Sequence, residues 1–331
     1  MVTPAATIDD VVRAVREHPG LRGKESIGLV TDVLGPTDSV SGPGDDAAAI
    51  DVGVGTVMVG GEAMWPPFVE ADPHGAGVAA VVANVNDLAA MGARPLGIVD
   101  TIVAREETAR LALEGMAHAS AIYRVPIVGG HLTIRDGSPS LSAFGIGVAN
   151  HVLSSTNVTP GQALLVVACL DGSMRDDFAF FTSIAARGDR LGDDVRALVE
   201  VADAGLCVAA KDVSMAGVLG SLAMLLEGSG AGAVVDLAAL PRPDGVALPR
   251  WAITFPTFSF LLCTPLDRAQ ACRQVFRRRG LACESVGVLD GSGVIRLVLD
   301  GRERQLLDLG AEPVTGLVRG PIAAPAGARG Q

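Results

Sequence analysis

The sequence predicts an α+β fold divided into two domains. Apolar runs typical of strands and helical stretches follow one another without strict strand–helix alternation, which favours α+β over a doubly wound parallel sheet. The polar segment SSTNVTPGQ (154–162), punctuated by Pro and Gly, interrupts this pattern near the middle of the chain. The 331 residues are enough for two medium domains. We expect an N-terminal domain over 1–155, a C-terminal domain over 160–320 and a disordered tail over 321–331.

The first half is predicted to begin with a helix that is followed by a loop-rich stretch. The helical pattern of Thr7–His18 ends at Pro19-Gly20, and loops are expected from there to Gly44. A longer helix is expected over 75–93, closed by its glycine at position 92. The other expected elements of this half are strands at 47–52, 56–59, 96–104, 125–130 and 142–149, and a helix at 106–123.

Glycines in two of these strands suggest special backbone contacts. In SAFGIGVA (142–149), large apolar residues alternate with Gly145 and Gly147, which leaves one face of the strand nearly bare. Glycines along one face suggest that another element packs close to the backbone. The strand VPIVGG (125–130) is expected to end in a glycine turn.

The second half restarts with the apolar run ALLVVACL (163–170), which predicts a strand. A basic helix is expected over 267–279. The remaining expected elements are helices near 192–203 and 213–228, and strands at 232–237, 257–264 and 294–299.

Composition argues against several classes of function. The formal net charge of −11 makes nucleic acid or an anionic membrane surface a poor main partner. The five cysteines are scattered and form no CxxC pair, so neither a zinc site nor a disulfide framework is indicated. The N-terminal stretch has no apolar signal core, and no apolar run approaches the roughly 18 residues of a membrane span. We expect a soluble, cytoplasmic protein.

Two adjacent aspartates stand out in the segment SGPGDDAAAI (41–50). Asp45 and Asp46 lie among serine, glycine and proline, immediately before an apolar run. They fit an ordinary solvated turn before a strand. They also fit a cation site, because hard metals such as Mg²⁺ are held by carboxylates and often bridge to phosphates. The segment alone leaves both interpretations open.

The predicted helix over 75–93 carries polar residues in an otherwise apolar sequence. Asn84 and Asp87 are three residues apart and therefore project on one helical face. Burying them without partners would be costly, so they either form internal hydrogen bonds or belong to a site. The spacing does not distinguish these alternatives.

Three further segments offer candidates, each with an ordinary structural alternative. Glu62 follows two glycines at the exit of a predicted strand, where a solvated loop glutamate is also common. His131 follows a glycine pair whose N–H groups could form an anion-binding concavity, although a lone histidine is more often structural. Lys211, Asp212 and Ser214 precede a predicted helix, where they could cap it or could expose N–H groups to a phosphate. The segment GLRGKES lacks P-loop spacing, and no GxGxxG after a strand, GxSxG or HExxH motif occurs.

Taken together, these segments resemble the aminoimidazole-ribonucleotide (AIR) synthase-like superfamily. The resemblance is greatest to an AIR synthase-related branch, whose nearest named enzyme is thiamine-monophosphate kinase. It rests on GDDAAAI (44–50), NVNDLAAMGARP (84–95), VGGHL (128–132) and KDVSMAGVLGSL (211–222). The combination of GDDAA with a downstream NDLAAMGARP is specific, whereas either segment alone would be weak.

The resemblance implies an N-terminal α/β sheet domain that joins a second copy in a dimeric barrel, and a C-terminal α+β domain. It implies ATP near the dimer interface, Mg²⁺, a small-molecule substrate and phosphoryl transfer without a covalent protein nucleophile. By this match Asp45, Asp87 and Asp212 would be catalytic, and these three together with Asp46 would hold the metal. The residues implied to contact the nucleotide are Gly44, Asp46, Asn84, Gly129, Gly130 and His131.

The chain departs from the kinase pattern at three positions where the relatives carry aspartate. It has Gly60-Gly61 before Glu62, His131 after the glycine pair, and Met215-Ala216 after Asp212. Each lost carboxylate should weaken Mg²⁺ binding, because affinity depends on the number and charge of the ligands.

Two hypotheses therefore stand. In the first, the chain is an ATP- and Mg²⁺-dependent enzyme that phosphorylates or activates a small metabolite. In the second, it is a degenerate subunit that binds a nucleotide or ligand without turnover. The stretch Trp65–Phe68 could shape the substrate pocket or pack at the dimer edge, and the sequence does not decide between these roles.

Overall fold

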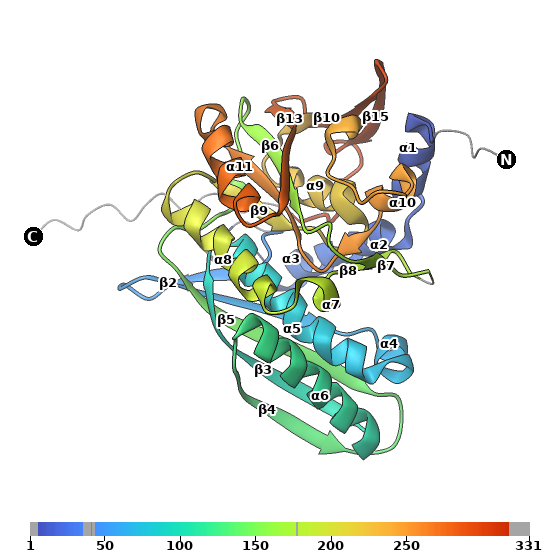
Figure 1. Cartoon of the computed structure of the whole chain (residues 1–331), viewed down its shortest axis with the longest axis vertical. Coiled ribbons are helices and arrows are strands. Elements are labelled where there is room, and N and C mark those ends of the chain that lie inside the picture. Colours follow the sequence, from blue (N-terminus) through green and yellow to red (C-terminus); the bar gives the residue numbers. More distant parts are fainter. Residues whose placement is uncertain (1–5, 36–40, 42–43, 177, 318–331) are drawn as a thin grey trace, which may run out of the picture.

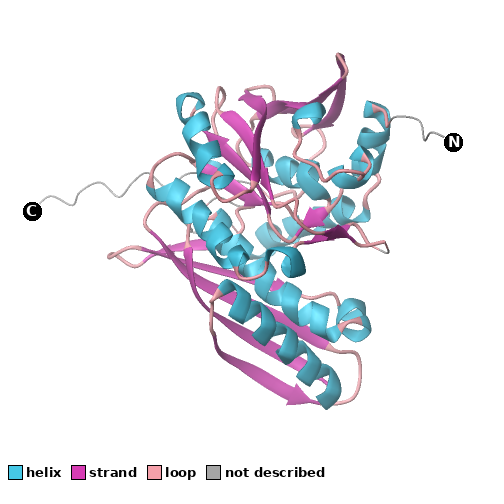
Figure 2. Ribbon diagram, viewed as in Figure 1, coloured by secondary structure: helices cyan, strands magenta, loops and turns pink. Residues whose placement is uncertain are grey.

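The computed structural model describes residues 6–35, 41, 44–176 and 178–317, and it confirms the α+β architecture. In Figure 1 a sheet formed by the first half lies in the lower part of the molecule, and helices α5 (Pro73–Ala90) and α6 (Glu106–Tyr123) cover one of its faces. A second, larger sheet formed by the second half lies in the upper part (Figure 2). The tail expected to be disordered lies outside the described residues.

The N-terminal sheet has five strands in the order β1-β2-β5-β3-β4. All pairs are antiparallel except β3 with β4, which run parallel because helix α6 connects them. The strands are β1 (Ala48–Asp51), β2 (Thr56–Ala63), β3 (Arg94–Ala104), β4 (Ile127–Ile134) and β5 (Ser140–Ala149). Helices α1 (Ile8–Arg16) and α6 agree closely with their predicted ranges, and Thr7 caps α1 through a hydrogen bond with the Asp10 N–H.

The bare glycine face of β5 packs against helix α5, as the sequence predicted. A Cβ at Gly145 would come 2.9 Å from the Leu88 side chain of α5, and one at Gly147 would come 3.3 Å from the same side chain. Glycines at these positions therefore let α5 approach the sheet closely. Phe144 and Ile146 project from the opposite face of β5 and are exposed.

The second half forms a seven-stranded sheet in the order β15-β14-β10-β13-β6-β12-β9 and a small sheet in the order β11-β8-β7. The strands are β6 (Ala163–Ala168), β7 (Ser173–Met174), β8 (Phe180–Thr182), β9 (Ala209–Asp212), β10 (Gly232–Asp236), β11 (Phe255–Pro256), β12 (Ser259–Thr264), β13 (Ala282–Asp290), β14 (Val294–Leu299) and β15 (Arg302–Asp308). The helices are α7 (Ile184–Arg187), α8 (Arg190–Asp203), α9 (Gly217–Glu227), α10 (Leu248–Ala252) and α11 (Ala269–Arg277), with 3-10 turns η2 (Ser155–Asn157), η3 (Leu237–Ala239) and η4 (Leu266–Arg268).

The two halves share a hydrophobic core along helix α5. One continuous cluster of buried residues includes Val81 of α5, Leu198 of α8 and Phe260 of β12. Helix α5 thus contacts its own sheet and also the α8 and β9 elements of the second half. A side chain on α5 can therefore meet residues from both halves. None of the helices in the described segments combines the length and apolar character needed to cross a membrane.

The loop predicted between the first helix and Gly44 is wrong for much of its length. The structure has helix α2 (Pro19–Arg22), the 3-10 turn η1 (Gly23–Ile27) and helix α3 (Gly28–Leu34). Proline is well suited to the first turn of a helix, so the proline taken as the end of α1 also begins α2. Leu29, Val30, Val33 and Leu34 of α3 have the spacing of one helical face, a signal that the prediction missed, and all four are exposed.

The glycine turn predicted at the end of β4 is also wrong. The strand continues through Gly129, Gly130 and His131 to Ile134, paired in register with β3. These glycines leave space for a neighbouring side chain, because a Cβ at Gly130 would lie 2.6 Å from a carboxylate oxygen of Asp100 on β3.

The predicted capping of helix α9 by Asp212 or Ser214 is wrong as well. The N-cap residue is Ala216, and Asp212 is the last residue of strand β9, paired with Phe260 of β12. The short segment AAKD (209–212) contains two charged residues and therefore lacks the apolar run that would have predicted this strand.

Candidate functional site

Three of the predicted metal ligands meet where the two halves join. Asp46 lies just before β1, Asp87 lies near the end of α5, and Asp212 ends β9. One carboxylate oxygen from each lies within 4.8 Å of the others, and this is the only such group of potential metal ligands in the described part of the chain. We call Asp46, Asp87 and Asp212 the acidic cluster.

The adjacent Asp45 and Asp46 point to different partners. Gly44 has φ +87°, a left-handed conformation that favours glycine, and it turns the chain just before them. The Asp45 carboxylate accepts hydrogen bonds from the Ser154 hydroxyl at 2.5 Å and the Ser155 N–H at 2.8 Å. Asp45 thus joins the acidic turn to the segment between the two halves, outside the acidic cluster, and its predicted catalytic and metal-binding roles stay predictions. Gly44 has a conformational role here, and its nucleotide contact also remains a prediction.

Asp46 is held by two donors from strand β9. The Lys211 ammonium donates to Oδ1 of Asp46, and the Asp212 N–H donates to Oδ2 at 3.0 Å. Both side chains of this ion pair are buried. The strand that supplies the third carboxylate of the cluster therefore also supplies a positive charge.

The charges in this cluster are strongly unbalanced. Burial raises the pKa of Asp87 well above its usual value, and the carboxylates of Asp212 and Asp46 raise it further. Burial raises the pKa of Asp212 to about 7, with Asp46 adding to the effect and Lys211 opposing it. Burial alone would lower the pKa of Lys211, but the charges of Asp46 and Asp212 outweigh it and hold that pKa above its usual value. One ammonium thus does not neutralise three carboxylates.

Glu62 and Lys24 act on this cluster from its edge. Glu62, on β2, reaches solvent, but the protein around its carboxyl still raises its pKa, an effect that Lys24 opposes and Asp46 strengthens. Lys24, on η1, also lowers the pKa of Asp212 through its charge. The segment GLRGKES, which lacks P-loop spacing, therefore contributes a second lysine whose charge acts on the site.

Asn84 lies inside the molecule, between α5 and β5. Its Nδ2 donates to the carbonyl oxygens of Ala80 at 2.9 Å and Ala143 at 3.1 Å. Its Oδ1 is buried and has no hydrogen-bond partner among the described residues. Asn84 therefore forms internal hydrogen bonds, which is the structural role that the sequence left open. Its Oδ1 could still accept a hydrogen bond from a ligand or water. Asn86 ties α5 to the second half by donating to the Thr257 carbonyl oxygen at 3.0 Å.

The segment Gly129–His131 lies on the edge strand of the N-terminal sheet. Its residues are exposed, and His131 forms a hydrogen bond of 3.1 Å with Thr133. The acidic cluster includes none of them, so their predicted nucleotide contacts remain predictions. Beside Gly130 lies Asp100, which is 7% exposed and whose pKa is raised by burial. A carboxylate inside the apolar run GIVDTIVA was the signal that could have singled it out.

The departures from the kinase pattern also have structural counterparts. A Cβ at Gly61 would come within 2.4 Å of the Phe144 ring, so a larger residue there requires that ring to move. Met215 is exposed and supplies no ligand oxygen.

In the Trp65–Phe68 stretch, Trp65 is exposed before helix α4 (Pro66–Ala71) while Phe68 packs against the shared core.

The acidic cluster suits a hard divalent cation. Oxygen donors are the ligands that Mg²⁺ prefers, and Mg²⁺ is commonly held by one or two carboxylates together with water and phosphate. Three convergent carboxylates with raised pKa values at Asp87 and Asp212 indicate a negative site that a cation would stabilise.

A second buried ion pair has a different character. Arg187 of α7 donates from Nε to Asp194 at 2.7 Å and from Nη2 to the same carboxylate at 3.0 Å. It also donates to Asp171 at 3.3 Å and to the Arg279 carbonyl oxygen at 2.5 Å. Its donors are thus distributed over fixed acceptors, and the pair ties α7 to α8 as a structural element.

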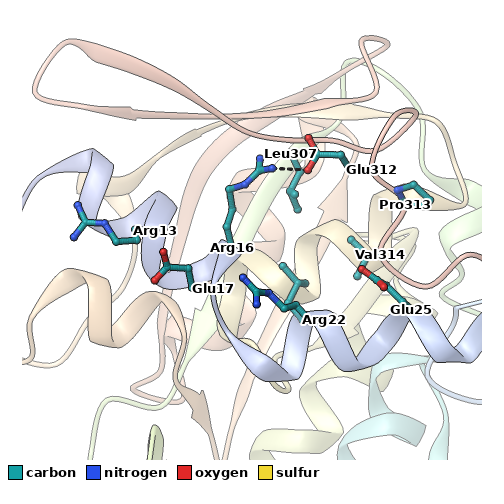
Figure 3. A pocket seen from close by; sticks show the side chains of 10 residues that line it. Arg13, Arg16, Glu17, Arg22, Glu25, Leu307, Glu312, Pro313 and Val314 are labelled. Atoms are coloured by element: carbon teal, nitrogen blue, oxygen red, sulfur yellow. Dashed lines mark hydrogen bonds and ion pairs between the residues drawn. The ribbon is translucent and has the colours of Figure 1, made fainter.

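A cavity of about 440 Å³ lies elsewhere, between α1, α2 and the segment after β15 (Figure 3). Three arginines and three glutamates line it, and Arg16 is already bound to Glu312 at 2.5 Å. No residue of the acidic cluster borders this cavity, and its charges are balanced by its own side chains. The candidate site is therefore the acidic cluster.

Two family models match ranges of this chain that include the acidic cluster. The family models "AIR synthase related protein, N-terminal domain" and "AIR synthase related protein, C-terminal domain" match 44–149 and 158–300. The uncharacterized protein sll0787 of Synechocystis is 31% identical over 317 residues, which are 93% of this chain and 98% of that protein. The phosphoribosylformylglycinamidine synthase subunit PurL of Moorella thermoacetica is 23% identical, over 86% of this chain and 43% of PurL.

Solved structures have the same fold. Thermotoga maritima PurL complexed with ADP has a TM-score of 0.74 and 22% identity, over 91% of this chain and 51% of that one. AaThiL complexed with AMPPCP and TMP has a TM-score of 0.66 and 16% identity, over 83% of this chain and 92% of that one. The chain thus spans about half the length of the PurL proteins that it matches.

Proposed function

The chain belongs to the AIR synthase related protein family, and we propose that it transfers a phosphoryl group from ATP to a small metabolite, or activates that metabolite, with Mg²⁺ as cofactor. The observation that carries this proposal is the convergence of Asp46, Asp87 and Asp212 from three separate segments. Thermotoga maritima PurL has been solved in complex with ADP and with ATP, and AaThiL in complex with AMPPCP, which supports ATP as the phosphoryl donor.

In this proposal each residue of the site has a separate task. Asp87 and Asp212, assisted by Asp46, would hold the metal, and a bound Mg²⁺ would supply positive charge to neutralise the phosphates. Lys211 keeps Asp46 in place through their ion pair. No side chain needs to become covalently attached to the substrate, because phosphoryl transfer depends mainly on positioning and electrostatic stabilisation.

Turnover is tested by incubating the protein with ATP, Mg²⁺ and a panel of metabolites and measuring ADP release. Asp87→Asn is expected to lower the rate at least ~100-fold, because it removes a charged ligand from the centre of the cluster. Asp236→Asn changes an exposed carboxylate that caps η3 and serves as the control. If no metabolite gives release above that of Asp87→Asn, the enzymatic proposal is refuted.

A second candidate function is nucleotide or ligand binding without turnover. The observation that favours it is the absence of carboxylates at Gly60-Gly61, His131 and Met215. This candidate predicts that an ATP analogue raises the melting temperature with little dependence on Mg²⁺. Rapid metabolite-dependent ADP release would exclude it.

The outer face of the N-terminal sheet supports the predicted homodimer. Val99 and Phe144 are cross-strand neighbours on this face, Ile146 follows two residues along β5, and all three are exposed. Contiguous exposed apolar surface commonly marks an interface, and the α5 and α6 helices cover only the other face. We propose that a second copy covers it. Phe144→Glu is expected to convert a dimer to a monomer in light scattering, and a wild type that is monomeric at micromolar concentration would refute this.

A further inference from the structure

The only two lysines in the 331 residues are Lys24 and Lys211, and both act on the acidic cluster. Every other basic side chain of the 26 is an arginine. The basic residues of the surface and of structural pairs such as Arg187–Asp194 are therefore arginines. Both lysines are instead residues whose charge acts on the acidic cluster.

Lysine and arginine differ in ways that suit this distribution. An arginine side chain is a wide planar fork that needs several acceptors around it. A lysine ammonium is a compact point charge on a flexible stem, close in character to a small cation. The acidic cluster is compact, with its ligand oxygens within 4.8 Å of one another, so it favours the smaller group.

The position of Lys211 is that of a counter-ion to Asp46. Lys211 is 6% exposed, and its ammonium contacts Oδ1 of Asp46. The other oxygen, Oδ2, already accepts from the Asp212 N–H at 3.0 Å. Both oxygens of Asp46 are therefore engaged by strand β9, which leaves Asp87 and Asp212 as the better donors for a metal.

Lys211 also changes the charge of the site. Its ammonium adds a positive charge beside the three carboxylates. A built-in cation lowers the affinity of such a site for divalent ions, because that affinity depends on the net charge of the ligands.

We propose that the Lys211 ammonium is a tethered cation that neutralises Asp46 in place of a divalent metal ion. Without this ammonium Asp46 would act as a further ligand, so Lys211 limits how strongly the site binds divalent ions. The inference rests on the proposed metal–nucleotide site and adds to it a specific role for a residue of this chain.

The test is to remove the ammonium and measure metal affinity directly. Lys211→Met keeps most of the side-chain volume and removes the charge. Mn²⁺ replaces Mg²⁺ as the probe, since both take oxygen ligands, and free Mn²⁺ is followed by electron paramagnetic resonance without nucleotide. The variant is expected to bind Mn²⁺ with a Kd at least ~10-fold lower than the wild type, because Asp46 becomes an uncompensated ligand. An unchanged or higher Kd overturns the proposal.

Lys24→Met is the matched control, since it removes the same charge from the only other lysine, which acts on Asp212 less strongly than Lys211 does. It is expected to change the Kd for Mn²⁺ by less than ~3-fold, because Lys24 is partly exposed and its charge is screened by solvent. If both variants tighten Mn²⁺ binding equally, general electrostatics accounts for the effect and the tethered-cation role is refuted. If Lys211→Met does not fold without metal, Lys211→Gln retains a hydrogen-bond donor for Asp46 and gives the same comparison.

Failure of this inference is distinguishable from failure of the proposed function. The wild type's response to an ATP analogue with Mg²⁺ tests nucleotide binding and does not depend on Lys211 variants. A wild type that binds the analogue, with Lys211→Met no tighter for Mn²⁺, refutes only the tethered cation. A wild type that binds neither analogue nor Mn²⁺ refutes the metal–nucleotide site and, with it, this inference.

Discussion

Two buried ion pairs in the described part of the chain have sharply different surroundings. Arg187 meets Asp194 with two hydrogen bonds, and its remaining donors meet Asp171 and the Arg279 carbonyl oxygen. Lys211 meets Asp46 beside two further carboxylates, Asp87 and Asp212, which have raised pKa values. The first pair is charge-balanced and closed, whereas the second leaves negative charge in excess.

This difference separates a structural pair from a functional one. A closed pair offers no remaining charge to a ligand, so its contribution is to hold α7 and α8 together. An excess of buried carboxylates opposes folding until a cation arrives, which is a common property of binding sites. This contrast predicts how much, and in which direction, substitutions in each pair change the free energy of unfolding.

The largest expected effect is at the closed pair. Arg187→Met should lower the free energy of unfolding by about 3–5 kcal/mol, because it leaves the Asp194 carboxylate buried without its partner. Urea denaturation measures the loss. Mn²⁺ at millimolar concentration should not restore it, since among the described residues Asp194 belongs to no group of three potential metal ligands. Recovery of stability with Mn²⁺ would show that this pair is an open site too.

The next effect is a pH dependence that belongs to the acidic cluster. The folded-state pKa of Asp212 is raised to about 7, so the folded protein binds this proton more strongly than the unfolded chain does. Its contribution to stability is complete below the unfolded pKa near 4 and is lost as pH rises toward 7.

Without metal, this carboxyl should lower stability by as much as about 1.4 kcal/mol per pH unit in that window. Asp212→Asn should make the slope shallower, with the remainder due to Asp87, whose pKa is also raised, and urea denaturation from pH 4.5 to 7.5 compares the two proteins. Parallel curves for the variant and the wild type would contradict the raised pKa.

These contrasts also mark what the sequence could predict. Strands and helices with clear periodicity, such as α6 and β5, were predicted closely because burial repeats along them. The acids Asp46, Asp87 and Asp212 were identified by resemblance, but only the folded chain shows that they meet. The neighbours Asp45 and Asp46 were grouped together, because a sequence does not reveal that the Gly44 turn sends them to opposite partners.

Other features needed three-dimensional contacts that no local pattern carries. The glycines of β4 have the composition of a turn, but the strand continues through Gly130, which pairs with Asp100 of β3. Lys211 and Lys24 are 187 positions apart in the chain, and neither follows a known motif. Their rarity was visible in the sequence and could have drawn attention to both.

A smaller effect, of opposite sign, is expected at the centre of the cluster. Asp87→Asn removes one of the crowded carboxylates, so without metal it should raise the free energy of unfolding by about 1–2 kcal/mol at pH 8. Mg²⁺ should stabilise the wild type and leave the variant almost unchanged. Thermal denaturation with and without Mg²⁺ measures both. A variant less stable than the metal-free wild type would mean that Asp87 is held by favourable contacts rather than by repulsion.

The smallest effect is expected at an exposed pair, which shows that distance alone does not set the energy. Arg304 of β15 donates to Asp9 of α1 at 2.9 Å, a separation similar to that in the Arg187–Asp194 pair, but both side chains are half-exposed. Water solvates the charges in the unfolded chain and in the folded one, so Arg304→Ala should change the free energy of unfolding by less than about 0.5 kcal/mol. The same urea experiment measures it beside Arg187→Met. A loss above about 1 kcal/mol would mean that the α1–β15 contact depends on this pair, and that burial is not what separates the strong pairs from the weak ones.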